Sequence, residues 1–255
     1  MSAPCAAWGM ARTSLTTPWH AAYILHSRPL AEHKVILQLL LPELGRLSAV
    51  VRKRSGKQRQ PLQPFQLLTL QLTGSHELKT ILKLEEQAPG IPLQGVALLC
   101  AFYLNELLCR VWPDNLASDQ LFSLYQTALQ HLQQQPAQLE QLEPVLRQFE
   151  FALLAELGQP VDWQLDASGQ PLQPQLCYSW QHEQGWCPAE QGFSGLLLQQ
   201  IDQGFWSEPG CRQAAKKISR MLLQPLLGDK PLQSRGLFSQ RIPETARMPW
   251  QDEHS

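Results

Sequence analysis

The chain has 255 residues, 44% of them hydrophobic and 17% charged, which favours a folded protein with a real core over a disordered one. Its net charge of −1 excludes a uniformly basic or acidic protein, yet the charges are unevenly placed. Residues 1–90 carry a net charge of +6 and residues 209–255 carry +4, whereas residues 91–208 carry −11. This distribution predicts a polyanionic partner at one place and a different partner at another.

The N-terminal part of the chain predicts a small β-barrel. Residues 1–18 contain no continuous apolar run, so we expect a disordered extension rather than a signal peptide. Residues 19–90 then contain short strand-like segments bounded by turn residues. These segments are 19–27, 34–41, 45–51, 64–72 and 78–86. Five short strands in so few residues predict a closed barrel such as an OB-fold, although a five-stranded SH3-like barrel would give the same pattern.

Pro89-Gly90-Ile91-Pro92 ends the strand pattern, and residues 91–241 predict a helical domain. We expect helices over 93–111, 118–134, 143–157, 193–203 and 209–223. Residues 158–192 are rich in Pro, Gly and Trp and predict an irregular insert or short β-ribbon, and residues 242–255 predict a flexible tail. The fold class is therefore α+β, a five-stranded barrel followed by a helical domain.

The sequence contains no motif for catalysis, for a zinc site or for a membrane span. The sequence has no glycine-rich phosphate loop, HExxH or GxSxG motif, so we expect no enzyme. Cys177 and Cys187 could bind zinc or form a disulfide, but they lack a CxxC partner, so zinc is not expected and no cofactor is predicted. The longest apolar run, 96–104, is shorter than the roughly 20 residues of a membrane span, which favours a soluble cytoplasmic protein.

A basic segment is the strongest candidate for binding nucleic acid. Arg52, Lys53, Arg54, Lys57 and Arg59 place five cations in eight residues between two expected strands. Cations of the neighbouring strands support this segment: Arg28, Lys34 and Arg46. Such a loop can neutralise phosphates, and the absence of a base-reading motif predicts sequence-tolerant binding. The alternative is a solvated loop that only aids solubility.

Two further sets of cations lie in the helical domain. Arg212, Lys216 and Arg220 recur at i, i+4 and i+8 with Lys217 beside them, which indicates either a second phosphate-binding surface or an ordinary solvated helix face. Residues 91–208, which we call the acidic block, contain two cations. These are Arg110 and Arg147, and both lie in segments that predict strongly apolar helices. Each could hold a partner's peptide carboxylate bidentately. Alternatively, each forms an internal salt bridge, for instance with Glu106 or Glu150.

Several segments together resemble the bacterial recombination mediator family RecO. They run in order along the chain, from the opening strand to the last helical segment: 23–29, 62–65, 103–108, 146–150 with 153–154, and 230–235. The resemblance implies an N-terminal OB-fold, a helical domain, and binding of single- and double-stranded DNA near the nucleoid. It also implies annealing of complementary strands and help in loading RecA onto strands coated by single-stranded-DNA-binding protein (SSB), with RecR as partner.

The resemblance also makes Arg147 the expected contact for the acidic tail of SSB. Some family members carry a four-cysteine zinc module where this chain has only Cys177 and Cys187, so a metal-free ribbon is expected. The extension before Trp19 has no family counterpart, and translation could instead begin at Met10. Other hypotheses are an RNA-binding OB module and a pure interaction adaptor. We expect a monomer that assembles with partners.

Overall fold

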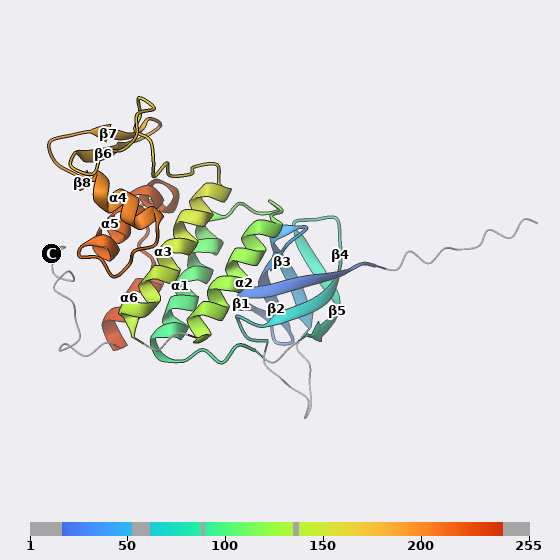
Figure 1. The fold of residues 1–255 in the computed structure, drawn as a ribbon. Helices are drawn as coiled ribbons and strands as arrows, with labels where there is room; N and C mark the ends of the chain where they lie inside the picture. Colours follow the sequence, from blue (N-terminus) through green and yellow to red (C-terminus); the bar gives the residue numbers. More distant parts are fainter. Residues whose placement is uncertain (1–16, 53–61, 88–89, 135–137, 242–255) are drawn as a thin grey trace, which may run out of the picture.

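The computed structural model describes residues 17–52, 62–87, 90–134 and 138–241. In Figure 1 a strand barrel lies at one end, a layer of helices lies beside it, and a small sheet projects at the other end. In the described ranges no helix is long and apolar enough to cross a membrane. The expected α+β fold, a five-stranded barrel followed by helices, is confirmed.

Five strands close into the N-terminal barrel in the order β1-β2-β3-β5-β4. They are β1 (Trp19–Ala31), β2 (Lys34–Leu41), β3 (Gly45–Arg52), β4 (Leu67–Thr73) and β5 (Leu78–Glu86). β3 and β5 pair in parallel, and every other pair is antiparallel. Alternate side chains such as Leu37, Leu39 and Leu41 fill the interior, as the period of two along a strand requires.

The helical domain is built around α1 (Gly95–Val111), which is covered by α2 (Asp119–Gln134) and α3 (Leu139–Glu156). Outward residues of the barrel, Tyr23, Leu25 and Leu40, belong to the same apolar cluster as these helices. Asn105 of α1 donates to the carbonyl of Leu25 at 2.7 Å. The barrel keeps its own interior cluster, and its outward residues pack into the apolar cluster of the helices.

The turn between β2 and β3 docks against the connection between α1 and α2. Gly45 has φ +70°, and a Cβ there would lie 2.0 Å from the carbonyl oxygen of Leu116, so only glycine fits this approach. The amide of Asn115 donates to the carbonyl of Arg46 at 2.8 Å, and the amide of Ser118 donates to that of Pro42 at 3.2 Å. This contact fixes the orientation of the barrel.

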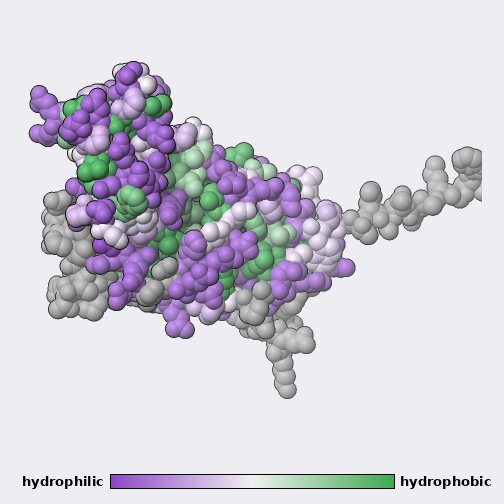
Figure 2. Space-filling view, viewed as in Figure 1, coloured by the Kyte–Doolittle hydropathy of each residue, from purple (hydrophilic) through white to green (hydrophobic). Residues whose placement is uncertain are grey.

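A third apolar cluster lies in the insert and the helices after it. The insert forms a sheet of β6 (Cys177–Gln181), β7 (Gly185–Pro188) and β8 (Phe193–Ser194), followed by α4 (Gly195–Asp202) and α5 (Cys211–Leu227). The rings of Trp163, Trp180 and Phe193 surround the buried Trp186. Figure 2 shows hydrophilic and hydrophobic residues mixed over this projecting lobe. The sequence predicted an irregular insert or a short β-ribbon here, and the structure has a three-stranded sheet.

Several element bounds differ from the sequence predictions, among them those of β1, β4, α3 and α5. β1 continues past residue 27 to Ala31 because its exposed end pairs with β2. α3 begins at Leu139 rather than 143 and contains Pro144, and α5 runs to Leu227 rather than 223. A last helix, α6 (Gln233–Arg241), was not expected. Its first amides are bound by the Glu106 carboxylate, a tertiary contact that no local pattern reveals.

Candidate nucleic-acid interface

Three of the expected cations share the outward face of β1, β2 and β3. Lys34 lies directly opposite Arg52 in the β2–β3 ladder, and Arg28 lies opposite Ile36, two residues along β2 from Lys34. All three cations are exposed, and none of them makes an ion pair with another described residue. Like charges at directly opposed positions are destabilising, so this pair does not stabilise the fold by itself. We call Arg28, Lys34 and Arg52 the basic face.

The remaining cations of the basic segment, Lys53, Arg54, Lys57 and Arg59, lie outside the described residues. Their segment leaves the barrel directly after Arg52 of the basic face. On its far side the chain is fixed by Phe65, whose amide donates to the carbonyl of Ile24 and whose ring packs on Phe102 of α1. Phe65 is buried with φ +67°, a conformation that a bulky residue adopts only where its surroundings impose it.

Arg46 lies away from the basic face. Its Nη2 atom is 3.1 Å from Asp114 Oδ1, and its Nε donates to the carbonyl of Trp112 at 2.9 Å. The side chain is 14% exposed. Arg46 therefore joins the barrel to the helical domain, and its guanidinium is already bound within the protein.

Arg212, Lys216, Lys217 and Arg220 form a basic stripe on α5 that mostly faces α3. Arg212 donates to the backbone carbonyl of Glu140 at 3.0 Å, and Lys216 Nζ lies 2.7 Å from Glu143 Oε1. Pro144 has no N–H, so the carbonyl of Glu140 lacks its usual helical donor four residues on, and Arg212 supplies the hydrogen bond instead. Desolvation by burial lowers the pKa of Lys216, although Glu143 opposes that effect.

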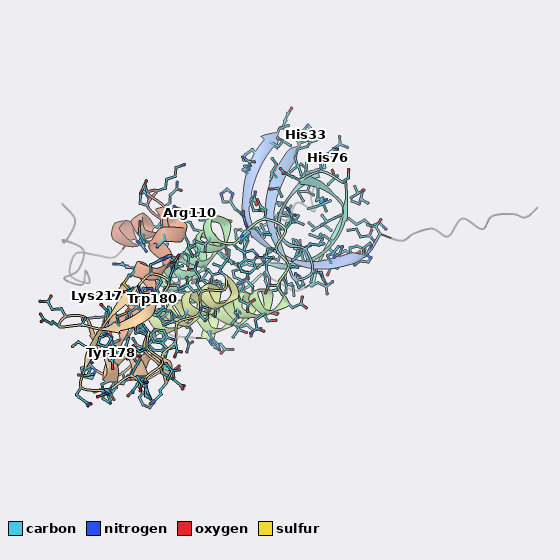
Figure 3. The ribbon with its side chains drawn as sticks, turned by 90° about the horizontal axis from the view of Figure 1, so that it is seen from above. His33, His76, Arg110, Tyr178, Trp180 and Lys217 are labelled. Atoms are coloured by element: carbon cyan, nitrogen blue, oxygen red, sulfur yellow. The ribbon has the colours of Figure 1, made fainter. Side chains whose placement is uncertain are left out.

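The other two cations of the stripe differ from each other. Arg220 is half-buried, and burial, followed by the nearby charges of Arg235 and Arg147, lowers its pKa. Lys217 is exposed and has no hydrogen bond or ion pair with any residue in the described part of the chain. In Figure 3, Lys217 lies on the helical part, well away from His33 and His76 on the barrel. The structure therefore does not bring the stripe and the basic face together.

Arg147 forms a buried polar network between α1, α3 and α5. Its Nη2 is 2.8 Å from Glu150 Oε1, and its Nη1 donates to Ser219 Oγ at 2.8 Å. Tyr103 donates its hydroxyl to the same Glu150 oxygen at 2.5 Å, and burial, with the Glu150 charge, raises its pKa. Among the described residues, Arg147 Nε and Glu150 Oε2 have no hydrogen-bond partner. Sequence analysis identified Arg147 as a candidate and Glu150 as a possible partner, but no sequence pattern indicated a role for Tyr103 or Ser219.

Arg110 holds the end of α5 rather than an acidic side chain. Its guanidinium donates to the carbonyls of Leu227, the last residue of α5, and of Pro231. Cationic side chains at a helix C-terminus satisfy carbonyls that lack a helical partner. Glu106, the acid considered for Arg110, instead accepts hydrogen bonds from Gln233 and Ser234 at the start of α6.

The cysteines of the described residues are all unpaired. Cys187 lies opposite Ser179 in the β6–β7 ladder, so it is offset by two residues from Cys177. Across the described ranges no three His, Cys, Asp or Glu side chains are close enough to hold a metal ion. The donor set of the insert therefore does not fit the four-ligand zinc module implied for some relatives.

Two family models match nearly all of the described chain. "Recombination protein O N terminal" matches residues 17–87, and "Recombination protein O C terminal" matches residues 92–236. The chain is 40% identical to DNA repair protein RecO of Pseudoalteromonas translucida (strain TAC 125) over 88% of this chain and 99% of that protein. It is 39% identical to the RecO of Alteromonas mediterranea and 40% identical to that of Stutzerimonas stutzeri (strain A1501), again over 88% of this chain and over 98% and 96% of those proteins.

Proposed function

The chain belongs to the RecO family of DNA repair proteins, and we propose that it binds single- and double-stranded DNA, anneals complementary strands and helps to load RecA onto SSB-coated strands. We propose that it does so without catalysing a covalent step. The observation that best supports the proposal is the basic face, where Lys34 and Arg52 oppose each other with no acidic partner among the described residues.

A polyanion would turn this unfavourable pair into a favourable one. The outward face of strands 2 and 3 is where OB-folds bind oligonucleotides, and here it carries Lys34 and Arg52. Phosphates near these cations would relieve their mutual repulsion and release counterions. A surface that holds two strands close also screens their repulsion and raises their effective concentration, so base pairing supplies the free energy of annealing.

Fluorescence anisotropy with a labelled oligothymidine, measured over a salt series, tests this DNA-binding surface. Each phosphate contact on a single strand contributes a log–log salt slope of about −0.7, so Lys34→Ala with Arg52→Ala should make the slope shallower by about 1.4. Lys230→Ala, which removes an exposed cation from the helical domain, is the matched control and should leave the slope unchanged. An unchanged slope in the double variant would place DNA elsewhere. An RNA strand that competes better than DNA would favour an RNA-binding protein.

We place protein docking on the helical domain, which carries the acidic block and would repel phosphate. The proposed partners are RecR and the acidic C-terminal tail of SSB, with Arg147 as the tail contact and Arg110 as a second cation. Arg147 would bind a tail carboxylate only if Glu150 released the guanidinium, because its side chain is 6% exposed and its inward contact to Glu150 is 2.8 Å. The neighbouring cations Arg220 and Arg235 would attract the acidic tail to this place.

A labelled SSB tail peptide tests the docking site. Glu150→Gln keeps the shape of the side chain and removes its charge, so it should strengthen peptide binding if the tail carboxylate replaces Glu150. Arg147→Gln should weaken it. Circular dichroism of both variants must first show an intact fold. Peptide affinity that neither substitution changes would show that the tail binds elsewhere on the protein.

A further inference from the structure

A second part of the barrel surface, away from the basic face, carries an exposed aromatic side chain beside a cation. Trp19 of β1 lies opposite Gln71 of β4, and Gln71 lies opposite Lys83 of β5. The neighbouring row, one residue further along each strand, consists of His20, Leu70 and Leu84, and its Leu70 and Leu84 are buried in the barrel. Since side chains alternate along a strand, Trp19, Gln71 and Lys83 face outward together.

We infer that Trp19, Gln71 and Lys83 form a platform that binds one nucleotide of single-stranded nucleic acid, with the base stacked on Trp19 and a phosphate bound by Lys83. This inference rests on the proposed DNA-binding function and adds a base contact to it. Trp19 is 41% exposed, so part of its ring is open to solvent. Among the described residues, Lys83 has neither an ion pair nor a side-chain hydrogen bond.

The dimensions of the row fit a nucleotide. Neighbouring strands lie about 4.8 Å apart, so the backbones at Trp19 and Lys83 are separated by about 10 Å, a span that the long lysine side chain shortens. Between them Gln71 donates its amide to the carbonyl of Thr17 at 2.6 Å, which fixes the chain that enters β1 just before Trp19. A β-bulge between Ile81 and Lys83 turns the exposed Leu82 outward beside the platform.

The charges around the platform indicate on which side of it the bound strand continues. Glu85 lies opposite Thr69, one outward row further along the barrel, so it would repel phosphate on that side. On the other side Thr73 lies opposite Thr80, and Thr80 lies opposite Val50 of β3, so this row carries no carboxylate. Val50 is two residues from Arg52. A strand could therefore pass from the basic face around the barrel to Trp19 across about three strand spacings, or about 14 Å.

Stacking and charge contacts predict different signatures. An aromatic side chain stacks on any base, and removal of such a contact typically weakens binding by roughly 5- to 150-fold. Because stacking needs a base, Trp19→Ala should weaken binding of an oligothymidine but not of an abasic strand of equal length. Trp19→Phe should retain most of the affinity. Lys83→Ala should weaken the binding of both strands and make the log–log salt slope shallower by about 0.7.

The experiment compares the full-length protein and these variants by fluorescence anisotropy with both labelled strands, after thermal melts confirm that each variant is folded. The expected result is a loss with Trp19→Ala on the oligothymidine alone. Equal affinity of Trp19→Ala and wild type on both strands would overturn the platform while leaving the proposed function intact. An equal loss on both strands would also overturn it, because no base is then involved. If the wild type bound neither strand, the proposed function itself would fail.

Discussion

Arg147 and Glu150, three residues apart on α3, form an ion pair of 2.8 Å in which both side chains are buried. The pair lies where α1, α3 and α5 meet; Tyr103 donates a hydrogen bond to Glu150 Oε1, and Ser219 Oγ accepts one from Arg147. Removal of one partner of a buried pair leaves a charge without compensation in a region of low dielectric constant. Loss of either partner alone should therefore destabilise the helical domain.

Glu150→Ala should lower the free energy of unfolding by about 3–5 kcal/mol, because the Arg147 guanidinium would stay buried without its carboxylate. Urea denaturation followed by circular dichroism measures this change. Glu183→Ala, which removes a carboxylate that is 87% exposed, serves as the control and should change stability by less than about 0.5 kcal/mol. A similarly small effect for Glu150→Ala would contradict the network.

Gly45→Ala should destabilise the contact between the barrel and the helices. The new Cβ would lie 2.0 Å from the Leu116 carbonyl oxygen, in addition to the strain of a positive φ. Gly169→Ala is a matched control, since Gly169 has φ +75° and no atom within 4 Å of the added Cβ. The φ strain should lower the free energy of unfolding by about 1–2 kcal/mol in both variants, and the clash should lower it further only in Gly45→Ala. Equal melting temperatures of the two variants would contradict this docking.

Arg212→Met should lower the free energy of unfolding by about 1 kcal/mol, because the Arg212 guanidinium donates a hydrogen bond to the Glu140 carbonyl of α3. DNA affinity should stay unchanged. Denaturant unfolding and oligonucleotide anisotropy measure the two quantities on the same sample. Lys217→Met, on the exposed side of α5, should change stability by less than about 0.5 kcal/mol. A loss of DNA affinity in Arg212→Met as large as in Arg52→Ala would show that the α5 stripe binds DNA directly.

Cys100 should resist alkylation in the folded protein. Desolvation raises the pKa of its thiol from 9.0 to about 12, so almost no thiolate forms at pH 8. Among the described cysteines, iodoacetamide should modify the partly exposed Cys177 and Cys187 before Cys100, as peptide mass spectrometry would show. Because the folded thiol holds its proton more tightly than the unfolded one, stability should fall as pH rises from about 9 towards 12. Cys100→Ala should make that alkaline decrease less steep, and an unchanged decrease would contradict the burial.

The parts of the fold that the sequence predicted are those whose pattern is local. The β2 residues Leu37, Leu39 and Leu41 alternate with outward residues, and α1 is apolar on nearly every side, so each follows from its own segment. The start of α6 does not, because its amides depend on Glu106, more than a hundred positions away in sequence. A pattern search of the last segment alone could not have found this helix.

The candidate sites show the same division. Cations are read from the sequence, but whether each is free depends on which element packs against it. Arg46 and Arg212 look like Arg52 in sequence, yet Asp114 and the Glu140 carbonyl bind the first two, while Arg52 faces Lys34. The platform at Trp19 was missed for a related reason. Its three residues are far apart in the chain and become neighbours only through the register of β1, β4 and β5.

The role of the basic face is tested most directly by the rate at which complementary oligonucleotides anneal, followed by fluorescence quenching on naked and on SSB-coated strands. The wild type is compared with Lys34→Ala/Arg52→Ala, which removes both opposed cations of the basic face, and with Lys230→Ala as the control. We expect the wild type and the control to anneal both substrates, and the double variant to be slower on both. A wild type that anneals neither substrate at any salt concentration, or a double variant as fast as the wild type, would contradict this role.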